Sequence, residues 1–69
     1  MRGTVKWFDI QKGFGFIIPD GGGPEVFVEY TALQGEGFRQ LEQGQRVEFE
    51  VCHTKAGPEA AGARTTPRW

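Results

Sequence analysis

The spacing of hydrophobic residues along this chain predicts short β-strands. Apolar and charged residues alternate most clearly over residues 46–51, in the order Arg-Val-Glu-Phe-Glu-Val, as they do in a half-buried antiparallel strand. Eleven glycines and four prolines punctuate the chain, and no long stretch has the apolar spacing of a helix. Five short strands are expected, which favours an all-β fold, a small closed or nearly closed barrel. They are predicted near residues 3–9, 13–18, 25–30 and 45–52, with a weaker one near 59–64.

Two of these strands carry aromatic residues on the face that should be polar. In the third strand, Val26 and Val28 share one face, which leaves Phe27 on the opposite one. In the second strand, Phe14 and Phe16 share a face, and the glycines beside them supply no side chains to the other. Aliphatic residues already furnish an inner face, so burying these rings as well would need a second layer that so short a chain lacks. The rings are therefore expected outside the barrel.

Aromatic and basic residues are interleaved over residues 6–39. The set comprises Lys6, Trp7, Phe8, Lys12, Phe14, Phe16, Phe27, Tyr30, Phe38 and Arg39. Proteins that bind single-stranded nucleic acid stack bases on such rings and hold the phosphates with cations. Gly13 and Gly15 are expected to let a base approach the backbone closely. Two other interpretations are open: rings that form the core, and an exposed apolar patch that binds another protein.

Length and charge limit the possible functions. Sixty-nine residues allow one domain with a thin core. The formal net charge of −1 is not that of a strongly basic nucleic-acid binder, so binding has to depend on where the charges lie. Residues 1–17 hold three basic side chains against Asp9 alone, whereas residues 18–50 hold seven acids against two arginines. A basic edge on an acidic body is expected.

No catalytic or metal site is predicted. Asp9, Glu29 and His53 could form an acid–base set, but nothing in the sequence places them together. One cysteine and one histidine cannot build a zinc site within a monomer. We expect no enzyme activity, no cofactor and no small-molecule substrate. The lone Cys52 excludes an internal disulfide and favours the reducing cytoplasm, and no apolar run approaches the roughly 20 residues of a membrane span.

Two segments resemble the ribonucleoprotein motifs of bacterial cold-shock proteins: Lys-Gly-Phe-Gly-Phe-Ile at residues 12–17 and Val-Phe-Val-Glu-Tyr at residues 26–30. Val-Lys-Trp-Phe at residues 5–8 precedes them as in that family, and the resemblance continues over about residues 2–63. It implies a cold-shock domain over residues 1–64, an OB-fold barrel of five antiparallel strands, with a short tail after it at 65–69. It also implies low-specificity binding of single-stranded RNA and DNA by a passive RNA chaperone or regulator of transcription or translation.

The resemblance assigns stacking roles to six aromatic residues and strand contacts to three basic ones. The aromatic residues are Trp7, Phe14, Phe16, Phe27, Tyr30 and Phe38, and the basic ones are Lys6, Lys12 and Arg39. A monomer is expected, although the long connection over residues 31–44 leaves strand exchange between two copies open.

The chain departs from the family pattern at the stacking face. Where the family usually has histidine it has Glu29, which puts a carboxylate beside Phe27 and close to passing phosphates. Asp9 replaces the usual asparagine after the Trp-Phe pair, and the last strand lacks the usual asparagine and valine, which predicts loose barrel closure. Weaker binding than in a typical relative is expected, and it should tighten as the pH falls and Glu29 is protonated. These acids also favour a rival function, a degenerate barrel that serves as a protein-interaction module.

Overall fold

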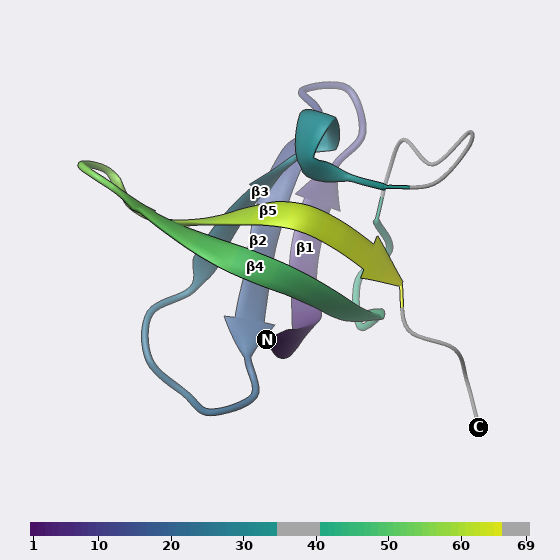
Figure 1. Ribbon diagram of the computed structural model, residues 1–69. Coiled ribbons are helices and arrows are strands. Elements are labelled where there is room, and N and C mark those ends of the chain that lie inside the picture. The colour runs from purple at the N-terminus through teal and green to yellow at the C-terminus, as the bar shows by residue number, and fades with distance from the viewer. Residues whose placement is uncertain (35–40, 66–69) are drawn as a thin grey trace.

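Five strands close into a barrel in the computed structural model, which describes residues 1–34 and 41–65 (Figure 1). The elements are β1 (Arg2–Asp9), β2 (Phe14–Pro19), β3 (Val26–Glu29), the 3-10 turn η1 (Tyr30–Ala32), β4 (Arg46–Thr54) and β5 (Gly57–Thr65). The predicted all-β barrel of five strands is confirmed. The last strand is not the weak one expected from the sequence, because β5 has nine residues, as many as β4. Among the described residues, no helix is long and apolar enough to cross a membrane.

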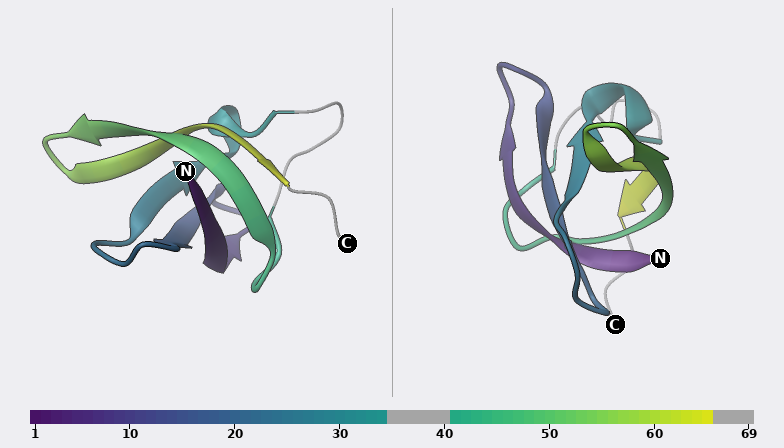
Figure 2. Two further views of the ribbon diagram at one scale, coloured as in Figure 1. Left: turned by 60° about the horizontal axis from the view of Figure 1, so that its bottom comes forward. Right: turned by 90° about the vertical axis from the view of Figure 1, so that its left-hand side faces the viewer.

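The strands lie around the barrel in the order β1-β2-β3-β5-β4. Figures 1 and 2 show β1, β2 and β3 as a twisted meander, with the β4–β5 hairpin crossing over it and projecting beyond it at its tip. Four of the pairings are antiparallel, as predicted. The pairing of β3 with β5 is parallel, and this corrects the expectation of a wholly antiparallel barrel. Strand direction cannot alternate all the way round a closed barrel with an odd number of strands, so at least one pairing must be parallel.

The parallel seam between β3 and β5 is short. It has one registered pair, Phe27 with Glu59, and the nearby bridge of Leu33 with Ala63 extends it beyond η1. The sequence predicted loose closure at the last strand. The barrel is closed, but few backbone pairs join the strands at this seam.

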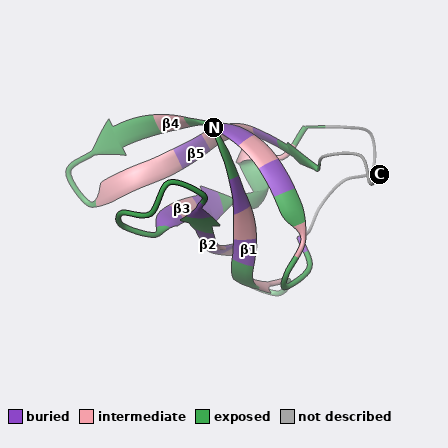
Figure 3. Cartoon of the chain, turned by 90° about the horizontal axis from the view of Figure 1, so that it is seen from below, coloured by how far each residue is buried: buried purple, intermediate pink, exposed green. Residues whose placement is uncertain are grey.

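Buried and exposed positions alternate along the strands (Figure 3), and the buried side chains form the core inside the barrel. The alternation predicted for β4 is confirmed, since Val47 and Phe49 are fully buried while Arg46 and Glu50 are exposed. Phe49 has the largest fully buried side chain, and the small residues Ala60 and Ala63 of β5 belong to the same buried cluster. The buried residues are Val5, Ile17, Val26, Val28, Leu41, Val47, Phe49, Ala60 and Ala63.

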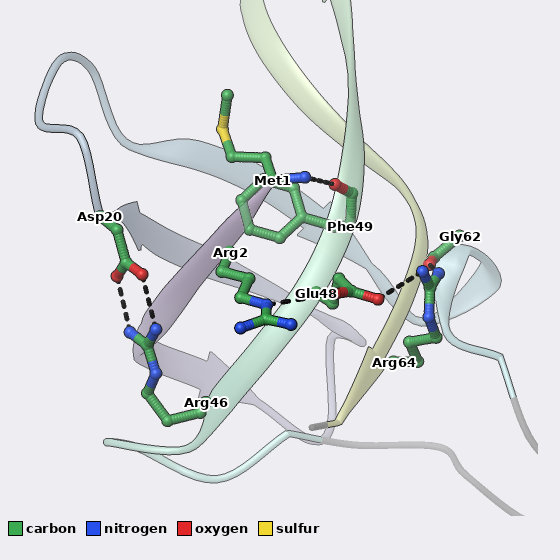
Figure 4. A network of polar contacts seen from close by, with 8 residues as sticks. All are labelled: Met1, Arg2, Asp20, Arg46, Glu48, Phe49, Gly62 and Arg64. Carbon is green, nitrogen blue, oxygen red and sulfur yellow. Dashed lines mark hydrogen bonds and ion pairs between the residues drawn. The ribbon is translucent and has the colours of Figure 1, made fainter. Parts of the chain in front are cut away.

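Ion pairs on the outside of the barrel tie strands together (Figure 4). Glu48 on β4 joins Arg2 of β1 (Nε to Oε2, 3.2 Å) and Arg64 of β5 (Nη2 to Oε1, 2.6 Å). Asp20, after β2, makes two 2.6 Å hydrogen bonds with the Arg46 guanidinium. The hydrogen bond from Arg2, followed by that from Arg64, lowers the pKa of Glu48, and the hydrogen bond from Arg46 lowers the pKa of Asp20. Arg2, Arg46 and Arg64 therefore have carboxylate partners.

These ion pairs predict a loss of stability in acid. The folded-state pKa values of Glu48 and Asp20 lie below their ordinary 4.5 and 3.8, so the unfolded chain takes up protons first as the pH falls. The melting temperature should be steady at neutral pH, begin to drop as the pH approaches 4.5, and keep falling below 3.8. In Glu48→Gln the drop should be shallower than in the wild type. Melting curves recorded from pH 7 to about pH 3 measure it.

Glu50→Gln is the matched control for this prediction. Glu50 is exposed on the same strand, and no salt bridge between described residues includes it. Its pH profile should follow that of the wild type. If Glu48→Gln did the same, its ion pairs would contribute nothing measurable, as is common for exposed pairs.

Candidate nucleic-acid interface

Four aromatic rings lie against one another on the outside of β1, β2 and β3. The centroid of Trp7 is 5.8 Å from that of Phe14 and 5.4 Å from that of Phe16, and the Phe27 centroid is 5.7 Å from each phenylalanine. The strand register explains the contacts, because Trp7 pairs with Phe16 and Phe16 pairs with Phe27. Tilted and edge-to-face contacts such as these hold aromatic rings in place. We call these four residues the aromatic face.

The aromatic face is separate from the core. None of its residues is among the buried cluster or the partly buried residues packed on that cluster. Trp7 is 39% exposed, and the three phenylalanines are half-buried. The alternative in which these rings form the core is therefore wrong. The prediction that Phe14, Phe16 and Phe27 lie outside the barrel is confirmed.

A β-bulge in β1 decides which side chains of the Val-Lys-Trp-Phe segment point outward. The pairing of β1 with β2 shifts between Val5 and Trp7, so Lys6 is the extra residue. In an unbroken strand Val5 and Trp7 would share the inner face. With the bulge, Val5 is buried, Lys6 and Trp7 are exposed, and Phe8 packs against the core. The structure thus places Phe8, one of the predicted binding residues, with the core and not on the aromatic face.

Gly13 and Gly15 are covered by the protein itself. Both are buried. A Cβ atom on Gly13, which has φ of 76°, would lie 2.7 Å from Cδ1 of Tyr30, and one on Gly15 would overlap the carbonyl oxygen of Trp7. The expectation that these glycines let a base approach is therefore corrected: they let β1 and the Tyr30 ring approach β2.

Tyr30 stands at the edge of the aromatic face. It follows β3, its backbone N–H donates to the Gly13 carbonyl (2.7 Å), and its side chain is 46% exposed. Its ring contacts Gly13, next to Phe14, and is available to a ligand that crosses the aromatic face. Phe38 and Arg39, also predicted as binding residues, lie outside the described residues.

Two of the basic residues predicted to contact the strand, Lys6 and Lys12, lie in the described part of the chain. Lys6 makes a salt bridge with Glu25 (Nζ to Oε2, 2.7 Å). Lys12 is exposed, and no salt bridge within residues 1–34 and 41–65 includes it. Of the three basic side chains in residues 1–17, Arg2 and Lys6 are held by carboxylates, and Lys12 is in no salt bridge between described residues.

The two acids that depart from the family pattern have different settings. One carboxylate oxygen of Asp9 accepts the backbone N–H groups of Gln11 and Lys12, both at 3.0 Å, and so shapes the β1–β2 turn. We did not predict this role, although aspartate at the start of a turn is its usual signal. Glu29 is exposed, pairs across strands with Phe14, and accepts a 3.0 Å hydrogen bond from the Thr31 hydroxyl.

The structure does not bring the possible acid–base set of Asp9, Glu29 and His53 together. Asp9 and Glu29 both pair with Phe14, one from β1 and the other from β3, so their backbones are roughly 10 Å apart. His53 pairs with Pro58 in the β4–β5 hairpin. Within the described part of the chain, no group of three or more His, Cys, Asp or Glu side chains could hold a metal ion.

Comparisons with known proteins agree on one family. Residues 1–66 match the family described as the 'cold-shock' DNA-binding domain. "Probable cold shock protein A" of Mycobacterium tuberculosis is 58% identical over 64 residues, which cover 93% of this chain and 96% of the relative. "Cold shock protein CspB" of Geobacillus stearothermophilus is 57% identical over 60 residues (87% and 89%), and "Cold shock-like protein CspE" of Escherichia coli is 52% identical over 61 residues (88% of each).

A solved structure shares the fold. The structure titled "drosophila Unr CSD456" matches 96% of this chain and 26% of its own, with a TM-score of 0.78 and 23% sequence identity. This likeness supports the barrel architecture and carries no further argument.

Proposed function

The chain belongs to the 'cold-shock' DNA-binding domain family and is a nucleic-acid-binding cold-shock protein; from this premise we propose that its ligand is single-stranded RNA or DNA, bound by stacking of bases on the aromatic face. The observation that carries the proposal is four rings in mutual contact outside a barrel whose core is filled without them. Each stacked base contributes about 1–3 kcal/mol, and every base has a π-face, so sequence preference is low.

The proposed action is passive. Bases stacked on the protein cannot pair with a second strand, so the protein holds RNA in open conformations and no nucleotide is hydrolysed. We propose that it acts as a monomer in the cytoplasm, where the exposed thiol of Cys52 stays reduced. The stacking residues in this proposal are the aromatic face and Tyr30, with Phe38 added from the sequence.

A fluorescence titration tests the proposal. Trp69→Phe leaves Trp7 as the one tryptophan, and heptathymidine and heptauridine should quench it in a saturable way. Affinity should fall with salt at a log–log slope of about −0.7 for each phosphate neutralised, near −2 to −3 for a few cations. A folded protein that shows no quenching at high micromolar oligonucleotide would instead support the protein-interaction module.

The Lys6–Glu25 ion pair predicts that Glu25 weakens binding. A phosphate that approaches Lys6 has to compete with the Glu25 carboxylate, which lies 2.7 Å from Nζ. Glu25→Gln should therefore raise oligonucleotide affinity about two- to fivefold at low salt, the scale of an exposed ion pair. It should also steepen the log–log salt slope by about 0.7, because one more lysine then displaces counterions. Titrations at several salt concentrations measure both quantities.

Glu50→Gln again serves as the control, since it removes the same charge from an exposed residue on β4. An equal gain in affinity in both variants would mean that net charge, and not the release of Lys6, is responsible.

A further inference from the structure

We propose that Glu29 selects the base stacked beside Phe14, favouring one that presents adjacent hydrogen-bond donors, above all guanine. This inference rests on the proposed function, because it assumes that bases stack on the aromatic face. It adds a preference at one position of the bound strand to a binding mode that is otherwise tolerant of sequence.

Glu29 is placed at the border of the aromatic face by the strand register. It is the last residue of β3 and lies directly opposite Phe14 on β2. Because side chains two apart on a strand share a face, it also lies on the same side as Phe27. A base stacked on these rings presents its edge sideways, toward the neighbouring side chain. The Glu29 carboxylate therefore lies where a base edge is expected.

The Glu29 carboxylate is oriented and has acceptor capacity left. Oε1 accepts the hydrogen bond from the Thr31 hydroxyl at 3.0 Å. Among residues 1–34 and 41–65, no salt bridge includes Glu29 and no further hydrogen bond reaches its side chain. An ionised carboxylate accepts about four hydrogen bonds and donates none. It repels a phosphate and attracts a group that donates.

Guanine fits this acceptor better than the other bases. The Watson–Crick edge of guanine carries N1–H and the N2 amine side by side, which match two carboxylate oxygens. Cytosine and adenine offer one amine beside a ring acceptor. Thymine and uracil offer one N–H between two carbonyl oxygens, which the carboxylate repels. Charge-assisted and bidentate contacts are the stronger hydrogen bonds, so the expected order is guanine, then cytosine and adenine, then thymine and uracil.

Single-base scanning of a thymidine heptamer tests the inference. In the Trp69→Phe protein, heptamers with one guanine at each position in turn are compared with heptathymidine through the concentration dependence of Trp7 quenching. Guanine in place of thymine at one position should tighten binding of the heptamer by about fivefold or more. Fivefold is the lower end of the discrimination expected from a bidentate contact with a base. Inosine at that position keeps N1–H but lacks the N2 amine, and it should lose much of the gain without any change to the protein.

Two protein variants complete the design. Glu29→Ala should reduce the guanine preference to less than twofold, and melting curves check that it is folded. Glu25→Ala removes a carboxylate that contacts Lys6, and it should keep the preference while raising affinity for every heptamer.

Three results would overturn the inference. The first is that the protein binds heptathymidine but no position prefers guanine by more than twofold. The second is that the Glu29→Ala protein prefers guanine as strongly as the protein with Glu29. Either result leaves the proposed function intact. The third is a folded protein that binds no heptamer, which overturns the proposed function together with the inference.

Discussion

Replacing Gly15 with alanine is expected to lower the free energy of unfolding by about 3 kcal/mol or more. The added Cβ would overlap the Trp7 carbonyl oxygen and lie 2.7 Å from Cα of Phe8. Both atoms belong to the backbone of β1, so no side-chain rotation relieves the clash and the two strands must separate. Overpacking in a rigid interior costs about 1–3 kcal/mol and sometimes more. A chain of this length has roughly 3–10 kcal/mol of stability in total, so much of it should be lost.

Urea unfolding measures this loss, and Gly21→Ala provides the control. No atom lies within 4 Å of a Cβ built on Gly21, and its φ is not in the left-handed region. Its unfolding midpoint should stay close to that of the wild type, as for most surface substitutions. Equal midpoints for the two variants would show that β1 and β2 are not as close at Gly15 as the structure has them.

Phe16→Ala is expected to weaken oligonucleotide binding by about 1–3 kcal/mol, or roughly 5- to 150-fold. Phe16 is in the middle of the aromatic face, with its ring 5.4 Å from Trp7 and 5.7 Å from Phe27. Removing it takes away one stacking surface and the support of both neighbours. Since the side chain is half-buried outside the core, the loss of stability should be smaller than the roughly 3–5 kcal/mol of a buried phenylalanine.

A second substitution at the same position separates stacking from general apolar contact. Phe16→Leu keeps a large apolar side chain without a π-face, so it should restore stability and only part of the affinity. Binding and melting curves are recorded for both variants. Unchanged affinity together with a melting curve typical of a lost core residue would refute the stacking role of Phe16.

The two predictions concern consecutive residues of β2 that have different roles. Gly15 is buried and lets β1 lie close to β2, whereas the next residue, Phe16, is part of the aromatic face on the outside of the barrel. Successive side chains of a strand point to opposite faces, so one segment of β2 can provide both a tight barrel wall and a binding surface.

Local pattern in the sequence predicted the strands and their faces. Val47 and Phe49 inside and Phe14 and Phe16 outside follow from a period of two. The turn residues placed the limits of β1 to β4 only to within about two residues. The ribonucleoprotein-like motifs identified the family for the same reason, because they are short contiguous segments. These segments, together with Val-Lys-Trp-Phe at residues 5–8, contain all four residues of the aromatic face.

Only the tertiary structure decided the features that depend on a second segment. The bulge that turns Trp7 outward and Phe8 inward is a property of the β1–β2 register, and the parallel β3–β5 seam is a consequence of closing five strands. The partner of Lys6 is nineteen residues away along the chain. The alternation of inward and outward side chains depends only on the sequence of one strand. The partners of a side chain and the packing around a glycine depend on which strands become neighbours when the barrel closes.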